Sequence, residues 1–522
     1  METRRRSPGI SLEGKRSEHQ GRAPVFLTAR AGSPCKRSSH LTKGYNMKTI
    51  VSLVALICIA GLPAPYAHGA PIPQTTQSPS PADTSRTATA AQTAATAVSP
   101  ERIADAQTIA DQFLKGDYAA LEARFDPTMK SAFPQDKFAE ARESLEARLG
   151  AFKQQLGTRA EKYQQYDIVY VTWEFENMTI DFKIVFDASG QIAGLLFQPA
   201  QSATPYAPPA YVNTEAFREQ DVTVGSGEWA LPGTLALPVG DGPFPVVVLV
   251  HGSGPNDRDE TIGPNRPFRD LAWGLASRGI AVLRYEKRTK QHSVKFTEDV
   301  MRNLTVKEET VDDAVSAVAL LRQTKGIDAA RIYVLGHSLG AMVLPRIGAA
   351  DPHIAGLIVM AGPTRPLEDI ILEQVTYITG LDGTVSADEK TSLDSLTAQA
   401  ARVKDTRLSA ATPAANLPLG LPANYWLDLR GYNPAEAAKG LKQPMLILQG
   451  GRDYQVTSAD FDGWKTVLGS RPDVELKLYP NLNHLFSEGE GMSTPAEYQN
   501  AGHVAEQVIA DIADWISRTA RK

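Results

Sequence analysis

One ten-residue stretch limits the possible fold of this chain more than any other. Arg331–Leu335 is a short, mostly apolar strand pattern, and it runs directly into Gly336-His337-Ser338-Leu339-Gly340. Glycines two residues before and two residues after a serine permit a very sharp turn, which lifts the serine hydroxyl above the end of a sheet. Motifs of this length also arise by chance, so the surrounding sequence must decide whether Ser338 is a nucleophile.

The region from about residue 218 onward alternates between strand and helix patterns. Phe244–Val250 is a continuous apolar run, as expected for a strand buried on both faces of a parallel sheet. Further strands are predicted at 221–224, 234–237, 280–285, 332–335, 354–360, 445–448 and 474–479, and helices at 268–277, 306–324, 341–349, 461–468 and 501–517. This alternation predicts an α/β fold with a mainly parallel sheet and helices on both faces.

The alternation stops between Gly362 and Gly440. This segment contains helical patterns at 367–378 and 387–401 and a proline-rich part around 413–422. It leaves from the carboxyl end of a predicted strand, where sheets of this kind bind their ligands. We therefore interpret residues 363–440 as a helical cap over the site, with a purely structural insertion as the alternative.

A serine hydroxyl needs a base to become a nucleophile, and the base needs an acid that orients it. On this architecture the serine comes first in the chain, then the acid, then the histidine. Of the nine histidines, only His484 and His503 follow a possible acid. His503 falls on the predicted final helix, whereas His484 lies in a loop after the last predicted strand. We therefore predict His484 as the base, and Asp453, in the glycine-rich turn after strand 445–448, as the acid.

Acyl transfer also needs N–H donors for the oxyanion of the tetrahedral intermediate. Leu339 directly follows the serine at a predicted helix N-terminus and is one predicted donor. The other is expected in His251-Gly252-Ser253-Gly254, which follows strand 244–250. Ser253 is the predicted donor in this segment, and Gly254 is the alternative. A plain turn is the non-functional interpretation of the same residues.

Residues 101–200 predict a separate, small α+β domain. Helical spacing at 103–114 and 138–152 is followed by strand patterns at 166–174, 178–186 and 191–197. No catalytic constellation is found in this domain, and its aromatic residues are predicted to form a core rather than a binding site. The proline-containing segments 70–100 and 201–217 are predicted linkers.

The segment 47–69 has the pattern of a secretory signal peptide. A short positive start at Met47-Lys48-Thr49 precedes an apolar run of 13 residues, and Ala67-His68-Gly69 provides small residues before a cleavage site at Ala70. We expect a periplasmic or secreted bacterial protein without stable membrane insertion after cleavage. An N-terminal membrane anchor is the alternative, and bulky Ile57 before Cys58 disfavours a lipoprotein. Residues 1–46 are predicted to be an upstream extension.

Charge and cysteine content exclude several other classes. Residues 1–46 carry ten Lys or Arg and three Glu, so the rest of the chain is more acidic than its net charge of −5 indicates. This balance argues against nucleic acid or an anionic membrane as the main partner. The two cysteines, Cys35 and Cys58, precede the predicted mature start, which leaves no disulfide, cysteine nucleophile or thiolate metal site.

Residues 218–520 resemble the α/β-hydrolase fold, and specifically bacterial esterases of the EstD type. The matching residues are His251–Asp259, Leu283–Arg288, Gly336–Gly340, Gly450–Asp453 and Asn483-His484. The resemblance implies hydrolysis of a small-molecule carboxylic ester with Ser338, Asp453 and His484 as catalytic triad. The implied mechanism needs neither a metal nor an organic cofactor.

One residue departs from this pattern, and a second resemblance covers the small domain. Glu286 stands where related sequences usually have Asp, which puts in doubt only a supporting role of its loop. Residues 101–200 resemble the domain of unknown function 3887 type, through the turn Phe-x-x-Gly-Asp-Tyr at 113–118 and the hairpin Asp-x-x-Gly-x-Ile-x-Gly-Leu-x-Phe at 187–197.

Two other functions remain open at this point. A serine aminopeptidase-like enzyme would use the same triad, with acidic cap residues to hold the peptide amine; Glu368, Asp369 and Glu373 are the candidates. A catalytically inactive hydrolase fold that serves as a binding module is the alternative of another class. Both make predictions about the site that differ from those for an esterase.

Overall fold

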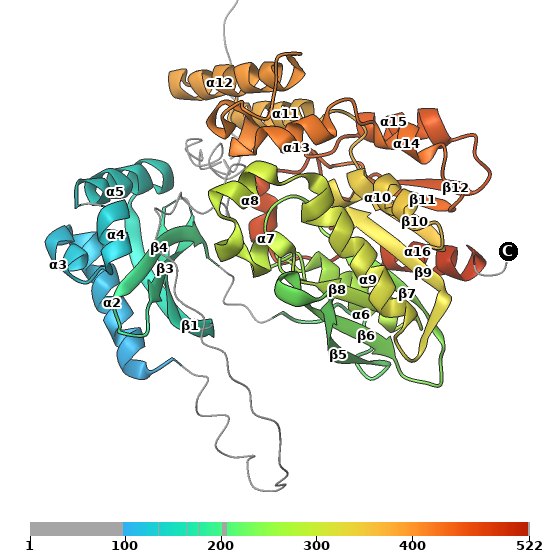
Figure 1. The fold of residues 1–522 in the computed structure, drawn as a ribbon, viewed down its shortest axis with the longest axis horizontal. Helices are drawn as coiled ribbons and strands as arrows, with labels where there is room; N and C mark the ends of the chain where they lie inside the picture. Colours follow the sequence, from blue (N-terminus) through green and yellow to red (C-terminus); the bar gives the residue numbers. More distant parts are fainter. Residues whose placement is uncertain (1–97, 134, 164, 177, 201–205, 520–522) are drawn as a thin grey trace, which may run out of the picture. The chain divides into compact units, whose positions relative to one another are not determined.

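The computed structural model describes residues 98–519 except 134, 164, 177 and 201–205 (Figure 1). The predicted upstream extension, the predicted signal peptide, both cysteines and most of the first predicted linker lie outside the described residues. In the described part of the chain, no helix combines the length and the apolar character needed to cross a membrane.

The first folded region consists of four helices followed by a four-stranded antiparallel sheet. The helices are α2 (Pro100–Lys115), α3 (Tyr118–Ala123), α4 (Pro127–Ala132) and α5 (Gln135–Leu149), and the strands are β1 (Phe152–Tyr163), β2 (Tyr166–Phe175), β3 (Thr179–Phe186) and β4 (Ile192–Pro199), in that spatial order. Ser99 caps α2, and Gly116, with φ of 78°, ends it. Trp173 and Phe182 are fully buried in the core of this domain, as predicted for its aromatic residues.

One strand of the small domain differs from the sequence prediction. The second helix was expected to run through Phe152, but α5 ends at Leu149, and Phe152 begins β1. Gly150, with φ of 77°, redirects the chain between them. The strand Phe152–Tyr163 is rich in polar and charged residues and has little strand propensity of its own. It forms because it pairs along the edge of β2, from Phe152 opposite Phe175 to Tyr163 opposite Tyr166.

An eight-stranded, mostly parallel sheet forms the second folded region. Its spatial order is β12 (Val474–Tyr479), β11 (Met445–Gly450), β10 (Gly356–Met360), β9 (Ile327–His337), β7 (Phe244–Val250), β8 (Ala281–Tyr285), β6 (Leu231–Pro238) and β5 (Phe217–Val224). Strand β6 runs antiparallel to both its neighbours, whereas β7, β8, β9, β10, β11 and β12 are parallel to one another. The predicted α/β class with a mainly parallel sheet is therefore confirmed.

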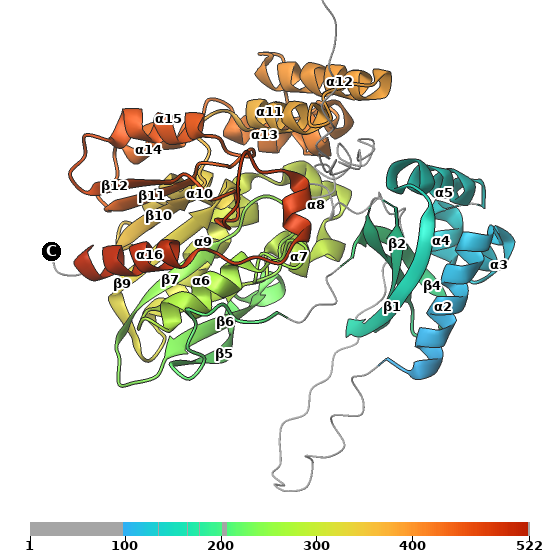
Figure 2. The ribbon, with the colours of Figure 1, turned by 180° about the vertical axis from the view of Figure 1, so that it is seen from behind.

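Helices cover both faces of this sheet. One face packs against α9 (Asp312–Arg322), α10 (Leu339–Ala350) and α15 (Ser458–Leu468), and the other against α6 (Pro267–Ala276) and α16 (Glu506–Thr519), as the two opposite views show (Figures 1 and 2). Within β7, Val246, Val248 and Val250 point to the first face and Val247 and Leu249 to the second. This alternation explains why the strand reads as an uninterrupted apolar run.

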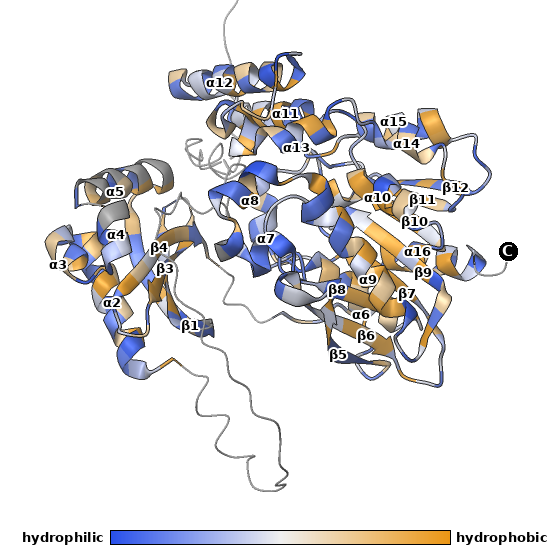
Figure 3. Cartoon of the chain, viewed as in Figure 1, coloured by the Kyte–Doolittle hydropathy of each residue, from blue (hydrophilic) through white to orange (hydrophobic). Residues whose placement is uncertain are grey.

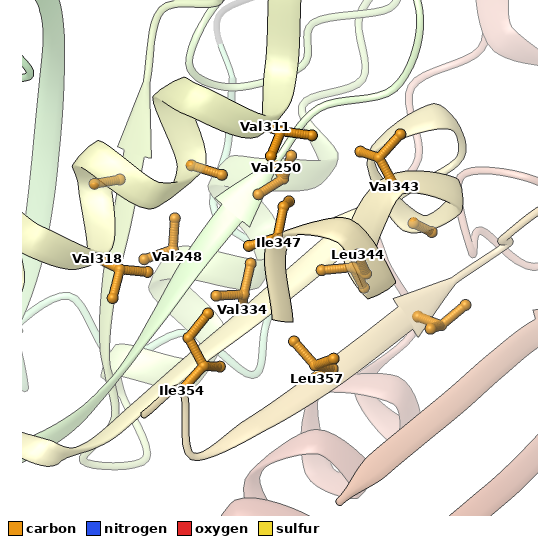
Figure 4. Close-up of a cluster of buried hydrophobic side chains, with 14 of the residues drawn as sticks. Val248, Val250, Val311, Val318, Val334, Val343, Leu344, Ile347, Ile354 and Leu357 are labelled. Atoms are coloured by element: carbon orange, nitrogen blue, oxygen red, sulfur yellow. The ribbon is translucent and has the colours of Figure 1, made fainter. Parts of the chain in front are cut away.

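Figure 4 shows the buried hydrophobic side chains that lie between the sheet and the helices α9 and α10. Val343, Leu344 and Ile347 from α10 lie over Val334 of β9 and Leu357 of β10, and all five side chains are buried. Figure 3 shows β9 mainly in the hydrophobic colour, whereas the short helix α8 (Glu298–Asn303) is hydrophilic. Close packing of this kind leaves the residues at the end of β9 little freedom to move.

Two predicted helices differ in detail from the structure. The helix expected at 306–324 runs without a break from Val306 to Arg322, but its residues Lys307–Val311 form a π-helical turn before α9. The final helix, expected from 501, begins at Glu506, so His503 precedes it in a segment without regular secondary structure. Before the final helix, helical spacing in the sequence continues past the real boundary, since apolar residues also serve as packing anchors in non-helical segments.

The insertion after β10 forms four helices at the carboxyl end of the sheet. They are α11 (Leu367–Thr379), α12 (Ala387–Lys404), α13 (Ala423–Leu429) and α14 (Pro434–Ala438). A capping box between Ser386 and Glu389 starts α12, and both views place α11, α12 and α13 together above the sheet (Figures 1 and 2). The predicted helical pieces are thus present, and α13 and α14 add to them.

Candidate active site

The serine turn lies where β9 passes into α10. Ser338 has φ of 53° and ψ of −116°, a conformation that side-chain-bearing residues rarely adopt. Its backbone N–H donates to the carbonyl of Met360 at 3.0 Å. A Cβ built at Gly336 would lie 2.5 Å from the carbonyl carbon of Gly340, and one built at Gly340 would overlap the carbonyl oxygen of Val250. Both glycines of the motif are therefore required by the turn itself.

Asp453 and His484 are in direct contact at the carboxyl end of the sheet. They follow the neighbouring strands β11 and β12, and the Oδ2 atom of Asp453 lies 2.7 Å from Nδ1 of His484. The other carboxylate oxygen of Asp453 accepts hydrogen bonds from the N–H groups of Gln455 and Val456, at 2.8 and 3.0 Å. Asp453 is 2% exposed and His484 3%. The carboxylate is thus fixed on both sides and holds the imidazole through Nδ1.

His484 also lies beside the nucleophile turn. Its ring centroid is 4.6 Å from that of His337, the residue before Ser338, and its carbonyl oxygen lies 3.0 Å from Nε2 of His337. Among the described residues, the Ser338 hydroxyl makes no hydrogen bond to His484. Such contacts are often long in ligand-free sites and shorten when substrate binds.

The two predicted oxyanion donors lie close to Ser338. Ser253 and Leu339 line the same cavity as Ser338, and Leu339 is the first residue of α10. A Cβ built at Gly252 would lie 3.2 Å from Cβ of Ser338, so the segment that carries Ser253 passes directly over the serine. Gly254, the alternative donor, lines the cavity as well.

A buried ion pair lies directly behind the serine turn. Nδ1 of His337 lies 2.9 Å from Oε2 of Glu260. Burial lowers the pKa of His337, but the charge of Glu260 and hydrogen bonding outweigh burial, so the pKa is raised. Burial raises the pKa of Glu260, but the charge of His337 and hydrogen bonds from His337 and the Gly252 N–H, with a smaller effect of His251, together outweigh burial, so the pKa is lowered. Both shifts favour the charged pair, which connects the serine turn to the loop after β7.

The cavity beside Ser338 has a volume of about 90 Å³ and a mostly apolar wall. Its apolar lining residues include Phe296, Met301, Leu304, Leu367, Ile370, Ile371, Leu419, Leu421 and Val456. Several of these belong to the insertion after β10, so this segment forms one wall of the cavity, as expected of a cap. Within the described part of the chain, Glu309 is the only acidic residue on the cavity wall, and it is paired with Lys287 at 2.8 Å.

The three acidic cap residues considered for binding a peptide amine do not line this cavity. Asp369 pairs with Lys404, and Glu373 pairs with Arg365 at 2.6 Å. Glu368 is buried away from the cavity, and burial raises its pKa. None of these carboxylates is placed to receive a cationic group beside Ser338.

His503, the other histidine that follows a possible acid in the chain, does not lie where it was predicted. His503 was placed on the final helix, but it precedes that helix, and its Nδ1 lies 3.0 Å from Oδ1 of buried Asp270. The hydroxyl of Tyr206 donates to the same carboxylate at 2.6 Å. This cluster fastens the segment before α16 to α6. Among the described residues, no group of His, Cys, Asp or Glu side chains is arranged to hold a metal ion.

Several charged residues at the site have no counterpart in the sequence prediction. Glu260, Lys287 and Glu309 come from three separate segments, and nothing in their spacing indicates that they meet. Lys287 does lie in the matched segment Leu283–Arg288, but no role followed from that match. Only the three-dimensional arrangement brings them together behind Gly252.

Comparison with known proteins decides the family. A family model described as "Alpha/beta hydrolase family" matches residues 247–499, and a model for a protein of unknown function (DUF3887) matches residues 106–195. Esterase EstD of Thermotoga maritima is 43% identical over 373 residues, which cover 72% of this chain and 85% of that esterase. The chain belongs to the alpha/beta hydrolase family. Both resemblances found in the sequence are thereby confirmed.

The solved structures that resemble this chain are more distant in sequence. The Pyrococcus furiosus esterase PF2001 is 17% identical, with a TM-score of 0.40, and the match covers 61% of this chain and 97% of that one. A putative dienelactone hydrolase from Klebsiella pneumoniae is 17% identical, with a TM-score of 0.36, over 58% of this chain and 99% of that one. Because both scores are low, the family assignment rests on EstD.

Proposed function

We propose that this protein hydrolyses carboxylic esters through an acyl-enzyme intermediate on Ser338. Membership of the alpha/beta hydrolase family, with an esterase as a 43% identical relative, makes the chain an ester hydrolase. The observation that carries the finer proposal is the buried contact of 2.7 Å between Asp453 and His484, beside a serine held in a strained turn. A histidine oriented in this way is suited to take a proton from the serine.

The proposed reaction has two steps. Ser338 Oγ attacks the ester carbonyl carbon while His484 Nε2 accepts its proton, and Asp453 stabilises the imidazolium. The oxyanion accepts hydrogen bonds from the N–H groups of Ser253 and Leu339. Collapse of this intermediate breaks the ester C–O bond, and His484 protonates the leaving alcohol. Water, deprotonated by His484, then attacks the acyl-enzyme and releases the acid and Ser338.

The cavity supports a short, uncharged acyl group as the substrate. A cavity of about 90 Å³ is small compared with typical ligand pockets. The apolar wall favours hydrocarbon, and the charge of its one acidic residue is balanced by Lys287. An aminoacyl substrate lacks a partner for its ammonium group there, so the aminopeptidase alternative is disfavoured.

The inactive binding module is disfavoured by the same geometry. A fold that had lost catalysis would have no need of a buried Asp453–His484 pair, which leaves two ionisable groups out of water.

We further propose that the predicted signal segment 47–69 directs the protein to the periplasm or outside the cell, with cleavage before Ala70. N-terminal sequencing of the mature protein from fractionated cells tests this location.

A substrate panel tests the proposed activity. The full chain is assayed with p-nitrophenyl esters from acetate to decanoate and with an aminoacyl p-nitroanilide. We expect hydrolysis of the short esters, little hydrolysis of the anilide, and loss of activity in Ser338→Ala. Faster cleavage of the anilide would favour the peptidase alternative. Ester hydrolysis unchanged in Ser338→Ala would contradict the mechanism.

A further inference from the structure

Gly252 is held from both sides by buried charged residues. Its N–H donates to Oε1 of Glu260 at 2.6 Å, and its carbonyl oxygen accepts from Nζ of Lys287 at 2.7 Å. The side-chain amide of Asn256 donates to the same carbonyl at 3.2 Å. Glu260 and Lys287 are each 2% exposed. Burying an ammonium group costs desolvation free energy, which a single hydrogen bond to a carbonyl does not offset.

The carbonyl of Gly252 belongs to the same peptide unit as the N–H of Ser253. Because a trans peptide is planar, its C=O and N–H point in opposite directions, and fixing one fixes the other. Lys287 therefore determines where the Ser253 N–H points. A positive charge on the carbonyl oxygen also polarises the peptide, which makes its N–H a stronger donor toward an anion. This is the N–H assigned above to the oxyanion.

Lys287 is in turn held by residues that reach the cap. Its Nζ lies 2.8 Å from Oε1 of Glu309, and the other carboxylate oxygen of Glu309 accepts from the hydroxyl of Tyr425 at 2.7 Å. Glu309 lies in the π-helical turn Lys307–Val311, and π-helical turns often occur at functional sites. Tyr425 lies on α13 of the cap and lines the cavity with Ser338. The contacts thus form one chain from the cap to the peptide that carries the Ser253 N–H.

We propose that Lys287 is a positioning residue for the oxyanion site, and that Glu309 and Tyr425 connect its position to the cap. The inference rests on the proposed function, because it assigns Lys287 a role in stabilising the oxyanion formed after attack by Ser338. It predicts that loss of the Lys287 charge lowers kcat much more than it changes KM. A cap that is correctly seated keeps Lys287 in place through Tyr425.

Removing Lys287 alone would leave Glu309 buried without its cation and could unfold the chain. The central variant is therefore the double substitution Lys287→Met with Glu309→Gln, made in the full chain. It removes both charges, and the amide introduced at position 309 can still bond to Tyr425. Glu309→Gln alone keeps the ammonium on Gly252. Lys477→Met is the control for loss of an ion-paired lysine. Lys477 lies on β12, away from the cavity, and its Nζ lies 2.7 Å from Oδ1 of Asp511 on α16.

Esterase kinetics and a tetrahedral inhibitor separate positioning from general stability. We expect the double variant to lose kcat by roughly 10- to 100-fold, below the 100- to 1,000-fold typical of deleting an oxyanion donor outright. KM should change less than threefold. Affinity for an aryl trifluoromethyl ketone, which forms an anionic adduct with the serine, should fall in parallel with kcat. Lys477→Met should stay within about threefold of the wild type, and Glu309→Gln, which keeps the ammonium on Gly252, should lose less kcat than the double variant.

Two outcomes would overturn the inference. The first is a folded double variant with wild-type kcat and inhibitor affinity. The second is an equal loss of kcat in Glu309→Gln, which would mean that the charge balance matters and the contact with Gly252 does not. Failure of the proposed function looks different, since the wild-type chain would then cleave no ester or Ser338→Ala would remain active.

A smaller substitution tests the connection to the cap. Tyr425→Phe removes one hydroxyl and leaves the ring in place. We expect kcat to fall about threefold to tenfold in an otherwise wild-type chain, and to fall no further when the substitution is added to the Lys287→Met, Glu309→Gln double variant. Equal effects in both backgrounds would show that Tyr425 acts independently of Lys287 and would overturn the connection.

Discussion

Asp453 and His484 meet at a distance of 2.7 Å, although 31 positions separate them in the chain. They follow β11 and β12, which are parallel neighbours paired from Met445 opposite Val474 to Gly450 opposite Tyr479. Parallel strands end at the same edge of a sheet, so the loops that follow them meet. A Cβ at Gly450 would lie 2.5 Å from the carbonyl oxygens of Leu482 and Asn483, which shows how closely the two loops approach.

Asp453→Asn tests the role of this contact. The amide can keep the shape of the site, but it cannot stabilise the imidazolium or enforce the productive tautomer of His484. We expect kcat for a short p-nitrophenyl ester to fall by about four orders of magnitude, as in triads of this type. Asp351→Asn is the matched control, because Asp351 is also a buried, ion-paired carboxylate, held by Arg322 at 2.7 Å. Comparable losses in both variants would argue against an orienting role for Asp453.

Much of this arrangement could be predicted from the sequence, for a physical reason. Strand ends and glycine-rich turns are local features that short sequence segments show, and the order of serine, acid and base can be read directly along the chain. Ser338 and Asp453 are each recognisable as the first functional residue after an apolar strand, and His484 follows the alternating strand Val474–Tyr479. The parallel sheet then brings these strand ends to one edge without further information.

The close approach of Gly340 to the backbone of β7 predicts that a larger residue is not tolerated at this position. Gly340→Ala would press a Cβ against the carbonyl of Val250, and neither group belongs to a flexible side chain. We expect loss of at least 100-fold in kcat/KM and a lower Tm, since the strained turn cannot form without moving β7. Gly440→Ala is the control, because no atom lies within 4 Å of a Cβ built there. Wild-type activity in Gly340→Ala would show that the turn has more room than described.

The ion pair of His337 and Glu260 predicts a specific pH dependence of stability. The pKa of His337 is raised in the folded chain, so its stabilising effect is complete below the unfolded pKa of about 6.5. This contribution is lost as the pH rises through the raised folded pKa. The free energy of unfolding should therefore fall with pH above about 6.5, and His337→Gln should reduce that slope.

Urea unfolding between pH 6 and pH 9 measures this slope. His353→Gln is the control, because the His353 side chain is 81% exposed. It should leave the slope as in the wild type. If His337→Gln and the wild type lose stability equally over this range, the pair is not charged in the way that its surroundings indicate.

The apolar cavity predicts how acyl chain length is selected. Leu421→Ala removes about three methylene-sized groups from the cap side of the wall. We expect the ratio of kcat/KM for the hexanoate ester to that for the acetate ester to rise about tenfold, because the longer chain gains buried apolar surface. Leu478→Ala, at an exposed position on β12, should leave the ratio unchanged. An unchanged ratio in Leu421→Ala would place the acyl group elsewhere.

Features that depend on pairing with another segment could not be predicted in the same way. Phe152–Tyr163 is a strand only because β2 offers it a partner edge, and its own sequence favours no strand. His503 reads as a helix residue, yet its contact with Asp270 spans 233 positions. The Lys287–Glu309 pair joins two segments whose charges would be interpreted individually as solvated surface residues. In each case a partner segment decides the structure: the next strand for Phe152–Tyr163, and a segment remote in sequence for His503 and for Lys287.

Covalent labelling of the nucleophile tests the central claim most directly. Diethyl p-nitrophenyl phosphate reacts with a serine activated by a histidine and leaves a stable diethylphosphoryl group on its oxygen. Mass spectrometry of the digested full chain should find one such group, on the peptide that contains Ser338, with activity lost in proportion to labelling. Ser338→Ala should remain unlabelled. A label on another residue, or full labelling of Ser338 with esterase activity intact, would contradict the account.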